Sequence, residues 1–387
     1  MVTEDKMQTF SVKTEVCFGS GALKKLGEIC ADSAVIFTDG FMKKSGTADS
    51  VASYMKNCKT VSVFSEIKPD PPVETVAAAL GFLLDKKAEV AVALGGGSSI
   101  DAAKSTVMIY ERKTGKKIPL IAIPTTSGTG SEVTSFSVIT DTEKGVKYPL
   151  VSDDLLPVTA ILAPELTVSV PKTVTADTGF DVLTHAVEAY ISTSANDFSD
   201  ALAEKAVELT LEYLPKAYEA PSDLTAREKM HTASCLAGMA FNAVSLGVVH
   251  GIAHALGANF HIPHGRANAM MLPYVLEYNA GLSEGSEGTQ ENFVRVRARL
   301  ARLAHLVGLD AYSEKYAAQS FIRRVYTMER SLGIPATLAD AGVTKEAYAA
   351  AKAHIVESAV KDACTATNPV KMTPSGVETI LARVDKF

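Results

Sequence analysis

Four side chains in the second half of this 387-residue chain have the chemistry of metal ligands: Asp181, His185, His250 and His264. The first two are four residues apart, a spacing that puts them one turn apart on the same face of a helix. One carboxylate with three imidazoles suits Fe(II), Zn(II), Mn(II) or Co(II) better than Cu(I) or Ca(II). A single histidine in an apolar helix is more often a packed core residue, but four of the eight histidines fall within residues 250–264. The set therefore predicts a metal site.

A run of three glycines, Gly95, Gly96 and Gly97, is predicted to connect a buried strand directly to a helix. Backbone N–H groups at such a helix start can bind a phosphate, because no Cβ blocks its approach. Ser98 and Asp101, three residues apart, have the spacing of a capping box. The run is neither G-x-G-x-x-G nor a Walker A sequence, so a tight strand-to-helix turn without a ligand is the alternative.

A second polar loop, Pro124–Glu132, follows the next predicted strand and offers the hydroxyl groups of Thr125, Thr126 and Thr129. Two such loops at the carboxyl ends of adjacent strands mark the place where doubly wound sheets bind nucleotides. Asp39 ends an earlier predicted strand, where a carboxylate can accept from a ribose 2′-hydroxyl and repel a 2′-phosphate. This pattern favours NAD over NADP, and ordinary surface turns are the alternative for both segments.

Short apolar runs alternate with helix-length segments in the first half of the chain. Runs of this length and composition are typical of strands buried in a parallel sheet. We expect strands at 34–38, 60–64, 90–94, 120–123 and 159–162, and helices at 73–87 and 100–112. Residues 136–140 and 146–151 are predicted to form an appended hairpin. The alternation indicates an α/β doubly wound, Rossmann-like fold.

The pattern changes after Pro171, where Ala-, Leu- and Glu-rich stretches with helical spacing dominate. We expect an α/β dinucleotide-binding domain over residues 1–170 and an all-α metal-binding domain over residues 171–387. The prolines at 215, 221, 263 and 273 are predicted to interrupt the helices, and the polar segment 281–292 is predicted to form an exposed loop. All four predicted metal ligands belong to the helical domain.

The composition is that of a globular chain, with 47% hydrophobic and 21% charged residues. A net charge of −6 and an isoelectric point near 5.8 argue against the basic stripe of a nucleic-acid-binding protein. The five cysteines are scattered and never form C-x-x-C, a pattern typical of reduced thiols. Because no run approaches a membrane span and the first residues contain no apolar signal segment, we expect a cytoplasmic protein.

Taken together and in this order, the glycine run, the threonine-rich loop and the Asp/His set resemble the iron-containing (group III) alcohol dehydrogenase family. The likeness extends along nearly the entire chain. Within the family, segments 64–71 and 144–149 are most similar to the 1-propanol and ethanol dehydrogenases of propanediol and ethanolamine catabolism. The resemblance implies a cleft between the two domains, in which a metal-dependent enzyme transfers hydride between NAD(H) and short-chain primary alcohols or aldehydes (1-propanol, ethanol, butanol).

The resemblance also implies roles for single residues. The metal ligands of the family, which bind Fe(II) with Zn(II) as the alternative ion, match Asp181, His185, His250 and His264. His254 matches a histidine beside the nicotinamide that is not a ligand, and we interpret it as a catalytic proton relay or as a packing residue. Phe241 matches a wall of the alcohol pocket, and Asp39 matches the position beside the adenosine ribose. The other cofactor contacts match Gly95, Gly96, Gly97, Ser98, Thr125, Thr126, Thr129, Lys147 and Leu166.

Other functions stay open at this point. A glycerol, 1,3-propanediol or lactaldehyde dehydrogenase would share the architecture. So would a dehydroquinate synthase-like lyase, although the cleft segments offer only Lys147 and Arg266 for a substrate phosphate. A non-enzymatic metal- or nucleotide-binding protein would not need an open coordination position, a cofactor loop and a histidine one turn from a ligand all at once.

The expected partner is a small alcohol or aldehyde, with no nucleic acid and no membrane. The relatives imply a homodimer or a larger homo-oligomer. Enclosure in a bacterial microcompartment stays open, because the short N-terminal tail is not clearly amphipathic.

Overall fold

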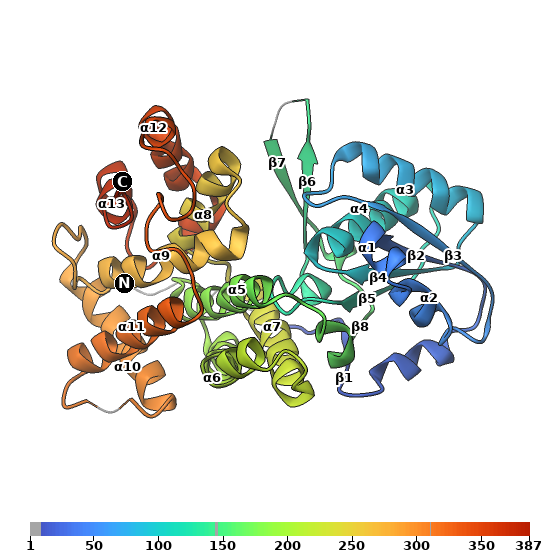
Figure 1. The fold of residues 1–387 in the computed structure, drawn as a ribbon, viewed down its shortest axis with the longest axis horizontal. Coiled ribbons are helices and arrows are strands. Elements are labelled where there is room, and N and C mark those ends of the chain that lie inside the picture. The colour runs from blue at the N-terminus through green and yellow to red at the C-terminus, as the bar shows by residue number, and fades with distance from the viewer. Residues whose placement is uncertain (1–8, 144–145, 310) are drawn as a thin grey trace.

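The computed structural model describes residues 9–143, 146–309 and 311–387. A parallel sheet with its covering helices forms one half of the molecule, and helices form the other half (Figure 1). This confirms the predicted order of an α/β Rossmann-like part followed by an all-α part. Lys144 and Gly145, which belong to one of the family-like segments, lie outside the described residues, as does the N-terminal tail 1–8.

The sheet contains β1 (Glu15–Phe18), β2 (Ala31–Asp39), β3 (Cys58–Ile67), β4 (Val90–Gly95), β5 (Leu120–Pro124) and β8 (Thr159–Leu162). The strands run parallel in the order β1-β8-β5-β4-β2-β3. Five of them were predicted. The sixth, β1, is a short edge strand of mixed exposure with no long apolar run.

Both faces of the sheet are covered, which explains the continuous apolar runs of its strands. On one face, Ala91 and Ala93 of β4 pack with residues of α3 (Val73–Lys86) and α4 (Gly97–Thr114). On the other face, Val92 and Leu94 pack with residues of α2 (Thr47–Ala52) and its neighbour α1 (Gly40–Lys44). The side chains of one strand therefore bind two helical layers to the sheet.

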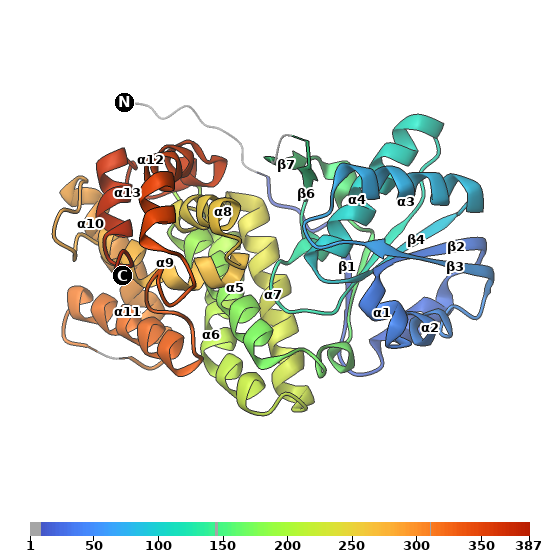
Figure 2. The same ribbon diagram turned by 45° about the horizontal axis from the view of Figure 1, so that its top comes forward.

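The predicted hairpin is present. Its strands β6 (Phe136–Asp141) and β7 (Val146–Val151) pair antiparallel, apart from the main sheet. In both views the hairpin stands on the side of the sheet half that faces the helical half (Figure 1 and Figure 2). A short segment, residues 133–135, connects the threonine-rich loop to β6.

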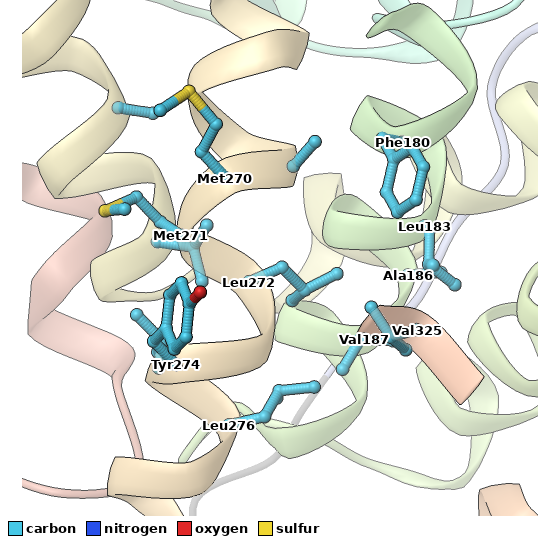
Figure 3. Close-up of a cluster of buried hydrophobic side chains, with 14 of the residues drawn as sticks. Phe180, Leu183, Ala186, Val187, Met270, Met271, Leu272, Tyr274, Leu276 and Val325 are labelled. Carbon is cyan, nitrogen blue, oxygen red and sulfur yellow. The ribbon is translucent and has the colours of Figure 1, made fainter. Parts of the chain in front are cut away.

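The helical half contains α5 (Lys172–Ile191), α6 (Asp197–Glu219), α7 (Leu224–Val244), α8 (Val248–Phe260), α9 (His264–Asn279), α10 (Gln290–Leu306), α11 (Glu314–Ser331), α12 (Lys345–Lys361) and α13 (Pro374–Leu381). Helix α5 is its centre, because nearly every residue from Thr175 to Ile191 is buried. Figure 3 shows Phe180, Leu183 and Val187 of α5 in the same apolar cluster as Met271 and Leu272 of α9. This packing places α5 beside α9.

Two of the predicted helix interruptions are wrong. Pro215 lies inside α6 and Pro273 lies inside α9. A proline removes one backbone donor, but both helices bury long apolar faces that outweigh this local cost. By contrast, Pro221 lies between α6 and α7, and Pro263 is the N-cap residue of α9. The polar segment 281–292 forms a loop as far as Thr289, which caps α10, so its last three residues are helical.

Among the described helices, none taken singly is long and apolar enough to cross a membrane. Helices α7 and α8 reach the required length and composition only as a pair, and they are bent by 105° relative to each other.

Candidate metal and dinucleotide sites

Three helices bring the four predicted metal ligands together. Asp181 and His185 lie one turn apart on α5, His250 lies in the first turn of α8, and His264 is the first residue of α9. Their ligand atoms all lie within 4.8 Å of one another. The packing of α5, α8 and α9 thus makes a single cluster from residues far apart in the sequence.

The spacing of these atoms fits a divalent ion. Ligands about 2.1 Å from a tetrahedral ion would lie roughly 3.4 Å from one another. The Oδ1 atom of Asp181 is 3.4 Å from Nε2 of His264, 3.8 Å from Nε2 of His185 and 3.9 Å from Nε2 of His250. The donor set and its geometry are therefore suited to Fe(II) or Zn(II).

The electrostatic environment also suits ligation. Asp181, His185 and His250 are buried, whereas the His264 side chain is about two-fifths exposed. Burial lowers the pKa of the His185 and His250 imidazoles, because the charged ring would lose its hydration. Both rings are therefore neutral at pH 7 and can offer a lone pair to a cation.

A buried carboxylate, Glu188, orients His250 from behind. One of its oxygens lies 2.6 Å from Nδ1 of His250, and the other accepts a hydrogen bond from the backbone of Val249 at 2.7 Å. Burial raises the pKa of Glu188 to about 8. When Glu188 is ionised, its carboxylate accepts a hydrogen bond from Nδ1–H of His250, which leaves Nε2 with a lone pair directed at the other ligands. Glu188 was not predicted from the sequence, because its partner is 62 residues away.

An amide supports the other side of the cluster. Asn268, one turn after His264 on α9, donates from Nδ2 to Oδ1 of Asp181 at 2.7 Å. The same nitrogen lies 3.1 Å from Nε2 of His250 and 3.2 Å from Nε2 of His264. This nitrogen therefore lies within 3.2 Å of three of the four ligand atoms, a contact that was not predicted from the sequence.

His254 lies beside the cluster but outside it. Its Nδ1 is 2.9 Å from Oδ2 of Asp362, and its ring stacks on His264 with centroids 5.2 Å apart. Nearly half of its side chain is exposed. His254 is therefore not one of the four clustered donors.

Phe241 of α7 forms an apolar wall against the cluster. Its ring stacks on His185 with centroids 4.5 Å apart, and it lies 6.2 Å from the ring of Phe136 at the start of the hairpin. The side chain is buried. An aromatic wall at this position limits the space beside His185.

The glycine run and the threonine-rich loop lie side by side at the carboxyl ends of two paired strands. Gly95 of β4 is in register with Pro124 of β5. A Cβ on Gly97 would lie only 2.7 Å from Cγ2 of Thr129, and one on Gly96 would lie 3.3 Å from Oγ1 of Thr126. Glycine is therefore required where the two loops meet, and Gly95 also has a φ of 147°.

The predicted capping box is wrong. Helix α4 begins two residues earlier than such a box requires, with Gly96 as an N-cap residue that has no side-chain hydrogen bond. The Asp101 side chain instead accepts from Ser131 Oγ and from the backbone of Val138. The first N–H groups of α4 therefore have no side-chain cap, which leaves the helix start suited to an anion.

Asp39 lies at the same edge of the sheet. Its Oδ1 accepts from the backbone of Phe41 and Met42 and so caps α1. Its Oδ2 lies 3.6 Å from the point that a Cβ of Gly95 would occupy. One carboxylate oxygen is thus used by the helix, and the other faces the glycine run.

The remaining predicted contacts have partners within the protein. Lys147 is 2.7 Å from Oδ1 of Asp70, whose backbone N–H donates to Ser98 Oγ at 3.3 Å. Leu166 packs against the apolar core on one face of the sheet. Arg266 is paired with Asp177 at 3.0 Å. The two basic residues considered for a substrate phosphate therefore both pair with carboxylates, which disfavours the lyase alternative.

Comparisons with known proteins agree with this architecture. Residues 13–164 match the family described as iron-containing alcohol dehydrogenase, and residues 175–384 match its C-terminal part, the Fe-containing alcohol dehydrogenase family, C-terminal. The chain is 42% identical over 377 residues to the 1-propanol dehydrogenase PduQ of Salmonella typhimurium, covering 97% of this chain and 98% of the relative.

Two solved structures are similar over nearly their full lengths. A 1,3-propanediol oxidoreductase superposes with a TM-score of 0.88 at 34% identity, covering 98% of this chain and 100% of that one. The sulfoacetaldehyde reductase of Bifidobacterium kashiwanohense, solved in complex with NAD+, superposes with a TM-score of 0.85 at 30% identity, covering 98% and 99%. The family predicted from the sequence is therefore confirmed: the chain belongs to the iron-containing alcohol dehydrogenases.

Proposed function

We propose that the chain is a metal-dependent, NAD(H)-linked oxidoreductase that interconverts short-chain primary alcohols and their aldehydes. The observation that carries the proposal is the cluster of one carboxylate and three imidazoles, whose donor atoms lie within 4.8 Å of one another. The similarity to a 1-propanol dehydrogenase supports the substrate class. The NAD+ complex of a structural relative supports the cofactor.

In this proposal Asp181, His185, His250 and His264 hold the ion, which is Fe(II) by family and Zn(II) as the alternative. When bound, the ion supplies Lewis acidity toward the oxygen of the alcohol or aldehyde. Glu188 keeps the lone pair of His250 directed inward, and Asn268 holds Asp181. These supporting contacts reduce the reorganisation that the ligands need when the ion binds.

His254 is proposed to move the proton between the substrate and solvent. Asp362 holds its Nδ1, so the proton would be exchanged at Nε2. The partial exposure of the ring supports a route to water. Phe241 is proposed as a wall of the substrate pocket that favours short, unbranched chains, because it fills the space against His185.

The glycine run (Gly95–Gly97) with Ser98 is proposed to bind the cofactor's phosphates, and the threonine-rich loop (Thr125, Thr126 and Thr129) is proposed to bind its phosphate or ribose oxygens. Asp39 is proposed to select NAD by accepting from the adenosine ribose, with Lys147 and Leu166 as further contacts. We also propose a domain boundary near residue 170 and a homodimeric or larger assembly. The proposed location is the cytoplasm, with the interior of a bacterial microcompartment as one alternative.

The test is the absorbance change at 340 nm with NAD, the metal-loaded protein and each primary alcohol from C2 to C5. We expect NADH formation with the highest kcat/KM at C2 to C4, and a much slower rate with NADP. Absence of turnover with every alcohol and aldehyde, in protein shown to contain the ion, would contradict the proposed reaction.

A further inference from the structure

Lys104 is completely buried, which is rare for a lysine. It lies two turns into α4, the helix that the glycine run opens. Its Nζ lies 2.7 Å from the carbonyl oxygens of Thr134 and Phe136, 3.1 Å from Ser131 Oγ and 3.2 Å from Thr134 Oγ1. None of these four oxygens belongs to a carboxylate, so the Lys104 ammonium donates its hydrogen bonds to neutral acceptors.

All four acceptors belong to one short segment, residues 131–136, which contains the end of the threonine-rich loop and the first residue of β6. Two neighbours on α4 bond to the same strip of chain. Asp101 accepts from Ser131 Oγ at 2.5 Å and from the backbone of Val138 at 2.9 Å, and Ser105 Oγ lies 2.8 Å from Ser137 Oγ. One face of α4 is therefore bonded to a continuous strip from 131 to 138.

The same strip and the adjoining loop contact the helical half on their other side. Asn242 of α7 accepts from the backbone and the hydroxyl of Ser135 at 2.8 and 2.9 Å. Ser127 Oγ lies 2.9 Å from Nδ1 of His231, also on α7. A Cβ on Gly130 would lie 2.7 Å from Cα of Gly238. The position of this loop therefore depends on bonds to α4 from one half and to α7 from the other.

Burying this charge is costly. Burial lowers the pKa of Lys104 to about 8, against the attraction of Asp101 and Glu132. An apolar side chain of similar length would fill the space without losing hydration. A contribution to the overall stability of the fold therefore does not explain why a lysine is buried here. Hydrogen bonds that fix the position of segment 131–136 do explain it.

We propose that Lys104 is a positioning residue for the dinucleotide site, where its ammonium holds segment 131–136, and through it the threonine-rich loop, against the helix that begins at the glycine run. This inference rests on the proposed role of the two loops in binding NAD(H). Lys104 itself is inside the protein and acts through the loop, so it is not a catalytic residue.

The test compares Lys104→Met with wild type by the fluorescence of NADH bound to metal-free protein. Methionine keeps the length and removes every donor, so two backbone carbonyls lose their buried partner. We expect the Kd for NADH to rise about tenfold, because the loop loses the buried hydrogen bonds that hold it in place. Because the hydrogen bonds of this segment end on α4 and α7 and not on the four ion ligands, the Kd for the divalent ion should change less than about twofold. In turnover, KM for NAD should rise while kcat at saturating NAD stays within about threefold.

Two further variants keep the outcome decisive. Thr106→Val is the matched control, because Thr106 is also completely buried on α4 but its hydroxyl bonds only within the helix, to Ala102. Thr134→Val leaves Lys104 in place and removes one acceptor, so it should raise the NADH Kd by a smaller factor. If Lys104→Met does not fold, Thr134→Val decides the question, with an unchanged Kd counting against the proposal.

The proposal is overturned if folded Lys104→Met binds NADH as wild type does. It is equally overturned if NADH affinity, ion affinity and thermal stability all fall together, which would indicate a general structural role. Failure of wild type to bind NADH at all would instead contradict the proposed function, so the two failures are distinguishable.

Discussion

The candidate metal site and the candidate dinucleotide site are built from different parts of the chain. The first consists of buried side chains on α5, α8 and α9, held by Glu188 and Asn268. The second consists of turns after β4 and β5, where glycines allow two loops to touch. The metal site depends on the chemical identity of its side chains, whereas the dinucleotide site depends on the backbone conformation that the glycines allow. Substitutions should therefore damage the two sites separately.

The strongest test of this separation is His185→Ala. Loss of one of four ligands should remove the ion and lower kcat/KM for 1-propanol by about 10³-fold or more, because the Lewis acid is lost. NADH affinity of the metal-free protein should stay unchanged. Metal analysis and NADH fluorescence check both statements, with His354→Ala, an exposed histidine on α12, as the control. Equal loss of ion and NADH binding would show that the two sites are not separate.

Glu188→Gln addresses the support behind the ligands. The amide has the same shape as the carboxylate but accepts more weakly from Nδ1 of His250. Ion affinity, measured by competition with a chelator, should therefore fall about 10- to 100-fold. Glu329→Gln is the matched control, because Glu329 is equally buried in the helical half. A similar loss in both variants would assign the effect to burial of a carboxyl group and not to His250.

Gly97→Ala tests the dinucleotide side. The added Cβ would lie 2.7 Å from Thr129 Cγ2, so the two loops must move apart. We expect the NADH Kd to rise about tenfold, with ion affinity unchanged. Gly81→Ala on α3 is the control, because its Cβ would meet nothing within 4 Å. An NADH Kd equal to that of wild type would mean that the glycine run does not contact the cofactor.

Asp39→Gly should have the smallest effect. Removing the carboxylate removes the repulsion of a 2′-phosphate, so the ratio of kcat/KM for NADP to that for NAD should rise by about tenfold at most. Stability should change little, because glycine replaces an N-cap aspartate at a cost of about a few tenths of a kcal/mol. Thermal unfolding checks the second point, with Asp32→Gly, at the start of the same strand, as the control. An unchanged cofactor ratio would remove the selective role of Asp39.

The same contrast explains what could be predicted from the sequence. Buried strands such as β4 and β5 are visible in the sequence as apolar runs. The glycines at 95–97 likewise indicate the turn between β4 and α4. The Asp181–His185 spacing on one helix and the crowding of histidines at 250–264 are also visible. All four ligands were predicted as one set, and the fold brings their donor atoms together. Residue type and local spacing carried these predictions.

The supporting residues could not be predicted in this way, because their partners are distant in the chain. Glu188 contacts a ligand 62 residues away, and the acceptors of Lys104 begin 27 residues further on. A lone lysine on a helix is usually solvated, so its sequence context gave no sign of burial. The capping-box prediction failed for a related reason: Ser131 and Val138, not the helix start, bind the Asp101 side chain.

The central claim is that one ion held by the four clustered side chains is needed for turnover. It is tested by adding Co(II) stepwise to metal-free protein while the rate of NADH formation from 1-propanol is recorded at 340 nm. We predict that the rate rises in proportion to bound ion and saturates at one ion per chain, and that His264→Ala needs far more ion to reach any rate. Full turnover in metal-free protein, or an identical titration for His264→Ala, would contradict the claim.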